Sequence, residues 1–121
     1  MAKTETAAIQ MKNLLDEVNK EVQQAAEEGI DESSKAAAKR LKANSPKRKG
    51  DYAKGWTVKK EGKLTRIVHN KTHYQLTHLL ENGHVIKNQY GEYGRVNGEK
   101  HIEPVEKWAA DDVVERINRK L

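Results

Sequence analysis

Apolar side chains recur every three, four or seven positions over residues 4–44, which is the period of one helix face. A continuous helix of about 38 residues, with a rise of roughly 1.5 Å per residue, extends over ~60 Å, more than the core of a small domain can cover. Gly29 leaves a kink or a break open, with Asp31 or Ser33 capping a second segment, and Pro46 ends the helical region. We therefore expect part of the N-terminal half to pack on another subunit. The stripe consists of Met11, Leu15, Val18, Val22, Ala26, Ile30, Ala37 and Leu41.

A polar segment and a predicted β-hairpin come next. Residues 45–55, SPKRKGDYAKG, are too polar and too rich in glycine and proline for a core element, so we expect a loop with a basic tip. The runs WTVKK and KLTRIVHN flank Glu61-Gly62, and a short glycine-containing loop between such runs is typical of a hairpin. Alternation places Trp56 and Val58 on one face of the first strand. On the second strand it groups Leu64, Arg66 and Val68.

The pattern predicts a short helix over residues 72–82. Thr72 or Asn70 can cap its start, and Asn82-Gly83 supplies a left-handed stop. Its buried side is expected to hold Tyr74, Leu76, Leu79 and Leu80.

The end of the chain combines a glycine-rich segment with an amphipathic helix. Residues 84–102 predict a strand, a long flexible hairpin tip and a returning strand, with Asn97-Gly98 as an additional turn. Pro104 suits the first turn of a helix over residues 103–121. The apolar face of this helix consists of Val105, Trp108, Ala109, Val113, Ile117 and Leu121.

Together these elements predict an α+β fold in a single domain, residues 1–121. We expect a long N-terminal helical region (1–44) and a basic loop (45–55). A small antiparallel sheet with its hairpin, a short middle helix and a long loop would follow (56–102). A C-terminal helix (103–121) would pack on the sheet.

Composition indicates a thin core. Only 36% of the 121 residues are apolar, there is no phenylalanine, and the mean hydropathy is −0.97. So little apolar surface offsets the entropy of chain ordering poorly, and burial against other subunits would supplement it. Cysteine is absent, which excludes disulfides and thiolate metal sites. No stretch resembles a signal peptide or a membrane span, so we expect a soluble protein, intracellular when made, without membrane contact.

The charge is distributed very unevenly along the chain. Residues 1–34 carry three basic and eight acidic side chains, residues 35–71 thirteen and two, and residues 72–121 seven and eight. The basic block favours polyanions, and the acidic and basic segments could also pair between copies. Tyr52 and Trp56 lie among the lysines and could stack on bases. The candidate contacts with DNA or with another subunit are Lys47, Arg48, Lys49, Lys54 and Lys59.

Candidate chemistry centres on HLLENGH, residues 78–84. His78 and Glu81 suggest a metal site or a hydrolase, but the i, i+4 histidine pair of helical zinc sites is absent. No nucleophile elbow or phosphate loop is present either. The segment is more simply a helix end followed by a strand or loop beginning at His84, and we assign no catalytic, cofactor-binding or metal-binding residue.

Two short motifs carry a family resemblance. Tyr74 through Leu80 lead into a "glutamate, any residue, glycine" turn at Glu81-Asn82-Gly83, and a "histidine, two residues, proline" motif, His101 to Pro104, precedes the last helix. In this order of elements the chain resembles the head-to-tail joining proteins of long-tailed bacteriophages, described as neck, tail-completion or minor tail components. The resemblance covers about residues 4–121.

The resemblance implies a non-enzymatic virion protein without cofactors, found in the neck or tail and in the host cytoplasm during assembly. It implies a homo-oligomeric ring, six-fold or twelve-fold, around the DNA channel between the portal and the tail tube. The expected partners are connector or stopper proteins, the tail terminator or tail tube, and packaged DNA without sequence specificity. A small non-specific DNA- or RNA-binding protein is the alternative. Residues of the 84–100 loop expected to reach a neighbouring subunit are Lys87, Tyr90, Tyr93 and Arg95.

Overall fold

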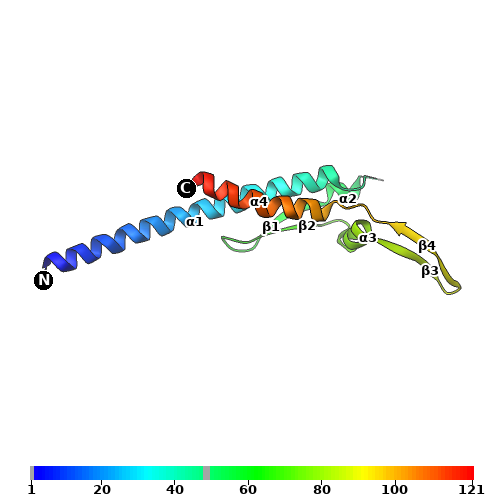
Figure 1. Cartoon of the computed structure of the whole chain (residues 1–121), viewed down its shortest axis with the longest axis horizontal. Helices are drawn as coiled ribbons and strands as arrows, with labels where there is room; N and C mark the ends of the chain where they lie inside the picture. Colours follow the sequence, from blue (N-terminus) through cyan, green and yellow to red (C-terminus); the bar gives the residue numbers. More distant parts are fainter. Residues whose placement is uncertain (1, 48–49) are drawn as a thin grey trace.

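The computed structural model describes residues 2–47 and 50–121, with the side chains of residues 2–6, 88 and 93 left out. It confirms the α+β class (Figure 1). The helices are α1 (Ala2–Asn44), α2 (Asp51–Lys54), α3 (Thr77–Asn82) and α4 (Ile102–Lys120), and a 3-10 turn, η1, covers Tyr74–Leu76. The strands are β1 (Trp56–Lys60), β2 (Arg66–Asn70), β3 (Gly83–Asn88) and β4 (Gly91–Asn97).

Helix α1 is unbroken, so of the alternatives left open at Gly29 the break does not occur, and neither Asp31 nor Ser33 begins a second segment. Gly29 is buried against α4, where a Cβ atom would lie 2.6 Å from Cγ1 of Ile117. The glycine therefore permits the close approach of two helices. After Asn44, Ser45 donates to the carbonyl oxygen of Leu41 and accepts from Trp56 Nε1, which fixes the end of α1 on the first strand.

The β1–β2 hairpin confirms the predicted faces for Trp56, Val58 and Val68, whereas Leu64, predicted on the second strand, lies before β2 and is 51% exposed. Its strands pair antiparallel, with Trp56 opposite Asn70, Val58 opposite Val68 and Lys60 opposite Arg66. Directly opposed residues share a face, so Trp56, Val58, Val68 and Arg66 point to the same side. This side faces α1 and α4, whereas Ile67 on the other side is 39% exposed.

The expectation of a polar loop over residues 45–55 is wrong at α2. Tyr52 and Ala53 in this short helix are buried, and so is Trp56 directly after it. The two aromatic rings lie edge to face with their centroids 5.7 Å apart. Because they form part of the core, their predicted stacking on bases is wrong.

The middle helix differs from its prediction in two ways. Tyr74 and Leu76 are 64% and 38% exposed, and only Leu79 and Leu80 are half-buried. Neither Asn70 nor Thr72 caps the helix, because Asn70 Oδ1 accepts from the backbone of Thr72 and His73, ahead of η1. Asn70 also donates to the carbonyl oxygen of Tyr52, and it is among the most buried residues described.

The segment after Gly83 is a second hairpin, β3–β4, which we call the arm. The returning strand is confirmed, but the long flexible tip is wrong, because only two residues separate the strands. The arm forms a sheet of its own and points away from the body at the end opposite to the N-terminus (Figure 1).

The core is small and lies where α1, α4 and the first hairpin meet. Its buried members are Ala37, Leu41, Tyr52, Trp56 and Val105, with Val68, Leu80, Ile102, Trp108 and Ala109 packed around them. Helix α4 runs antiparallel to the C-terminal half of α1 (Figure 1). Leu121, predicted on the apolar face of α4, is instead 68% exposed.

Candidate assembly surfaces

Glu81 joins the end of α3 to the start of α4. Its Oε1 accepts from the backbone N–H of His101 and Ile102 at 2.7 and 2.8 Å, and its Oε2 accepts from that of Glu103 at 2.8 Å. The next residue, Pro104, has no N–H, so the carboxylate satisfies the first donors of the helix. Burial raises the pKa of Glu81, but the three N–H donors and the nearby His101 outweigh it, so the net shift of the pKa is downward.

His101 connects this capped helix start to the core. Its Nδ1 lies 2.7 Å from the carbonyl oxygen of Glu99, which can only accept, so Nδ1 carries a proton. Its Nε2 lies 2.7 Å from the hydroxyl of Tyr52. Burial, together with the charge of Glu81, raises the pKa of Tyr52 to about 12. The two motifs that carried the family resemblance are thus in direct contact inside the molecule.

The same region anchors the arm. Gly83 has φ +79°, and a Cβ atom there would lie 2.3 Å from the carbonyl oxygen of Val96. The close approach of β3 to β4 at this point therefore requires glycine. Arg95 Nη2 donates to the carbonyl oxygen of Asn82, and Lys100 Nζ donates to its Oδ1, both at 2.6 Å. The base of the arm is therefore tied to the end of α3.

Beyond its base the arm exposes apolar side chains on both faces. Val85 lies opposite Arg95 and shares its face with Lys87, whereas His84 lies opposite Val96. Between Arg95 and Glu92 the second strand has one residue more than the first. An isolated two-stranded hairpin is marginally stable in water, so the arm is suited to a partner. The half-exposed apolar residues are Val85 (43%), Ile86 (45%) and Val96 (44%).

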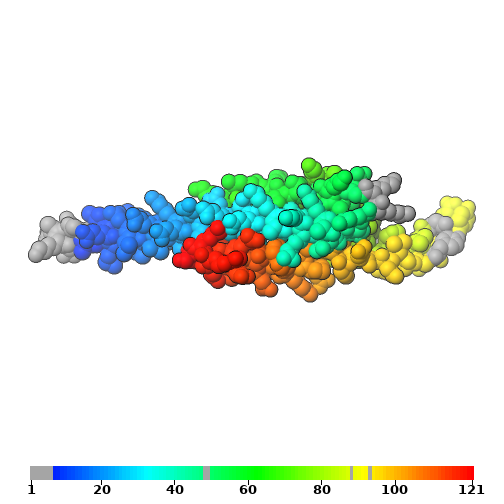
Figure 2. Space-filling model, turned by 90° about the horizontal axis from the view of Figure 1, so that it is seen from above, coloured from blue at the N-terminus to red at the C-terminus, as the bar shows by residue number. Residues whose placement is uncertain are grey.

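The N-terminal half of α1 exposes a second apolar surface. We call Met11, Leu15, Val18 and Val22 the bare stripe; they are 66%, 60%, 45% and 44% exposed. Helix α4 ends beside Glu28, so nothing in the described chain covers the stripe. Figures 1 and 2 show this part of α1 extending past the C-terminus, at the end of the molecule opposite to the arm.

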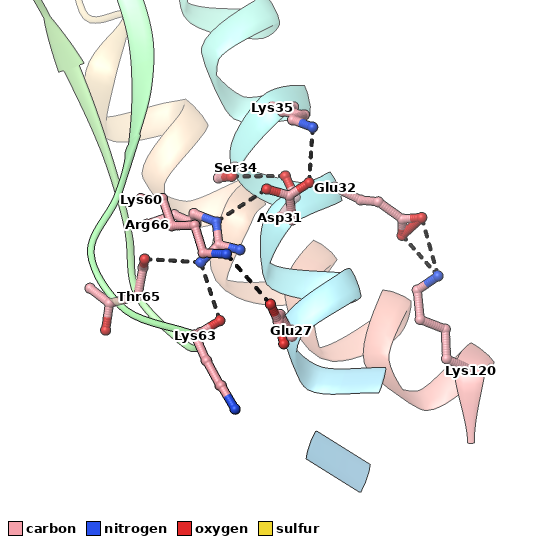
Figure 3. A network of polar contacts seen from close by, with 10 residues as sticks. All are labelled: Glu27, Asp31, Glu32, Ser34, Lys35, Lys60, Lys63, Thr65, Arg66 and Lys120. Carbon is pink, nitrogen blue, oxygen red and sulfur yellow. Dashed lines mark hydrogen bonds and ion pairs between the residues drawn. The ribbon is translucent and has the colours of Figure 1, made fainter. Parts of the chain in front are cut away.

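A polar network holds the middle of α1 against the first hairpin (Figure 3). Arg66 Nε donates to Asp31 at 3.1 Å, while its Nη1 donates to the carbonyl oxygens of residues 62, 63 and 65. Hydrogen bonds from Lys35 and Arg66 hold the pKa of Asp31 below its usual range. Lys60 pairs with Glu27 at 3.7 Å. These contacts fix the turn of the hairpin on the helix.

A basic groove lies between α1 and β1. We call it the lysine groove; it holds about 380 Å³ and is lined by Lys35, Ala38, Lys39, Lys42, Trp56, Thr57 and Val58. Lys35 is paired with Asp31 at 2.9 Å, but Lys39 and Lys42 have no acidic partner among the described residues. The groove gathers three cations from successive turns of one helix, so it presents a positive surface suited to a polyanion.

The structure does not gather the predicted basic residues into one site. Lys47 and Lys54 are exposed on the segment after α1 and on α2, and Lys59 is paired with Glu61 at 3.3 Å. Arg48 and Lys49 lie outside the described residues. Of the arm residues, Lys87, Tyr90 and Arg95 are exposed, and the side chain of Tyr93 is outside the description.

Sequence analysis missed the central role of Glu81 and the lysine groove. The groove had a signal, since Lys35, Lys39 and Lys42 recur at helical spacing. Glu81 is engaged by backbone donors, and His78 is exposed. Within residues 2–47 and 50–121, no three His, Asp or Glu side chains come together to hold a metal ion. In the same ranges, no helix has the length and apolar character needed to cross a membrane.

A protein-family model described as "Bacteriophage HK97-gp10, putative tail-component" matches residues 9–83. Because the match covers more than half of the chain, the chain belongs to this family of structural phage tail components. The matched region runs from the bare stripe to the first residue of the arm, and it includes the lysine groove and Glu81. No curated protein and no solved structure matches the chain.

Proposed function

We propose that this tail component forms a closed ring at the head–tail junction of a long-tailed phage. The ring joins the portal or connector to the tail tube around the DNA channel. The observation that supports this most directly is the presence of two different unpartnered apolar surfaces, the arm and the bare stripe, at opposite ends of one elongated chain. Surfaces that differ and face apart favour head-to-tail contacts, which close into a ring when the rotation between neighbouring copies completes a full turn and otherwise give open filaments.

In this proposal the ring has six-fold or twelve-fold symmetry. It contacts a connector or stopper protein on one side and the tail terminator or tail tube on the other. The protein is part of the virion at the neck or tail, and it is present in the host cytoplasm during assembly. Its role is structural rather than catalytic.

The lysine groove would face the DNA channel and contact phosphates without reading sequence. Lys39 and Lys42, which have no acidic partner among the described residues, supply the cations. The predicted residues Lys47, Arg48, Lys49, Lys54 and Lys59 remain candidates for further contacts with phosphates. Contacts of this kind are electrostatic and leave DNA free to move past the ring.

Deletion of the gene in the phage that encodes it tests the proposal. We expect infected cells to accumulate DNA-filled heads and unattached tails, and complementation with the intact gene to restore complete particles. Electron microscopy of complete particles should locate the protein at the neck. Infectious particles of normal yield in its absence would refute the proposal.

A small non-specific nucleic-acid-binding protein is the second candidate, and the lysine groove is the observation that favours it. The two functions differ in where the protein is found. A nucleic-acid-binding protein of the host cytoplasm would be absent from purified virions, whereas a ring component would be present in a fixed small number of copies per particle.

A further inference from the structure

The bare stripe continues a seam that α4 already occupies. From Met11 onwards, residues of α1 at alternating spacings of four and three fall on one line: Met11, Leu15, Val18, Val22, Ala25 and Gly29. At its inner end this line is covered, since Ala25 and Gly29 are buried and Gly29 faces Ile117 of α4. The outer end therefore has the apolar pattern of a helix interface but lacks its cover.

A row of glutamates beside the seam indicates the charge of the surface that would pack on it. Glu28 and Glu32 both pair with Lys120 near the end of α4, at 3.6 and 3.0 Å. Glu17 and Glu21 continue the row along the same flank of the bare stripe and have no ion pair among the described residues. The missing cover should therefore be apolar with cations beside it, as the end of α4 is.

The arm has this character. Val85, Lys87 and Arg95 share one of its faces: Arg95, which also donates to the carbonyl oxygen of Asn82, lies opposite Val85, and Lys87 follows two residues further along β3. Glu92 lies opposite Lys87, and strands β3 and β4 together still carry one more basic than acidic side chain. The net positive charge of the arm is therefore complementary to the negative charge of Glu17 and Glu21.

The two surfaces also match in length, and they cannot meet within one molecule. The six residues of β3 extend over ~20 Å at about 3.3 Å per residue. Met11 to Val22 covers ~17 Å at about 1.5 Å per residue. The arm and the bare stripe lie at opposite ends of the chain (Figure 1), so the arm that covers a given stripe must come from another copy.

We propose that the arm of one copy lies along the bare stripe of the next copy. Val85 packs on Val18 and its neighbours, and Lys87 and Arg95 lie beside Glu17 and Glu21. Each subunit then gives an arm at one end and receives one at the other. The inference rests on the proposed function and deepens it, because it names the partner surface within the ring.

The absence of cysteine allows a direct test by cross-linking the full chain. Two single-cysteine variants, Val18→Cys and Val85→Cys, carry different tags and are mixed at high concentration under mild oxidation. We expect a disulfide between the two tags and little product from either variant alone. The matched control replaces Val18→Cys by Val114→Cys, which is 56% exposed on the outer side of α4 and should give no mixed product.

The outcomes separate this inference from the proposed function. Dimers from Val18→Cys alone would indicate pairing of α1 with α1 and would overturn the inference, as would a chain that remains monomeric or forms rings without the mixed disulfide. Rings seen by electron microscopy would in those cases leave the proposed function standing. A mixed disulfide within open filaments, together with infectious particles lacking the protein, would support the inference and refute the ring at the neck.

A charge swap provides a second readout. Glu21→Lys or Lys87→Glu alone should raise the apparent Kd of self-association on the order of tenfold, because like charges then face each other. The double variant should recover most of the lost affinity, since each interface regains an opposite pair. Additive losses in the double variant, measured by analytical ultracentrifugation, would contradict the docking of the arm on α1.

Discussion

At the scale of single residues, Glu81 illustrates what local sequence reveals and what it hides. The run HLLENGH indicates a helix end, and the structure places one there. The sequence does not reveal that the glutamate caps a helix that begins some twenty residues later, because this contact depends on the path of the arm between them. The same holds for His101 and Tyr52, which meet only in the folded chain.

Glu81→Gln should destabilise the fold. The amide offers one oxygen to three backbone donors, and its NH₂ group would face N–H groups, so we expect a loss of about 2–3 kcal/mol in the free energy of unfolding. Urea denaturation measures this loss. The control is Glu106→Gln, an exposed position on α4 that should change the free energy by less than about 0.5 kcal/mol.

The contribution of Glu81 should also depend on pH. Its pKa is lowered in the folded state, so its stabilising effect is present above the unfolded pKa of about 4.3 and is lost as the pH falls through the folded value. The difference in stability between the native chain and Glu81→Gln should therefore shrink below about pH 4. An unchanged difference at pH 3 would show that the charge of Glu81 is not the cause.

At the scale of elements, periodic patterns predicted the regular parts well. Alternation gave the first hairpin and its faces, and helical spacing gave α1 and α4. The presence of glycine led to a wrong expectation at two places. At Gly29 the low helix propensity of glycine suggested a break, whereas the glycine is needed for the close approach of α4. In the arm the abundance of glycine suggested a long tip, whereas the chain forms two paired strands there. In both cases tertiary packing decides, and a single sequence does not contain that information locally.

Gly29→Ala tests the helix contact. Alanine would normally stabilise a helix interior by up to about 1 kcal/mol. Here the new Cβ would lie 2.6 Å from Ile117, so we expect a net loss of about 1–2 kcal/mol and a lower Tm. In the background of Ile117→Ala the same substitution should become neutral or stabilising. A higher Tm for Gly29→Ala alone would show that α4 does not pack this closely.

At the scale of the whole molecule, composition predicted a chain with too little core, and the structure shows where the deficit lies. Most of the exposed large apolar residues lie on the N-terminal half of α1 and on the arm, at its two ends, whereas Leu64, Ile67 and Val114 are exposed between them. The long apolar stripe already indicated an uncovered part of α1. That the arm lies at the opposite end could not be read from the sequence, because it follows from the direction in which α3 and β3 leave the body.

The lysine groove predicts a distinct response to salt. Lys39→Gln with Lys42→Gln should weaken binding of duplex DNA equally for all sequences and reduce the slope of log K against log salt concentration by about 2. Fluorescence anisotropy at several salt concentrations measures the slope. Lys107→Gln with Arg119→Gln, on exposed positions of α4, removes the same charge and should leave the slope nearly unchanged.

Because α1 is one unbroken rod, its two ends cannot turn independently. A rotation of α1 caused by contacts at the bare stripe would turn the lysines near its C-terminal end through the same angle. In the proposed ring, the direction of these lysines and the spacing between subunits would therefore change together. A wider ring would turn its cations to a new angle without any substitution of a lysine.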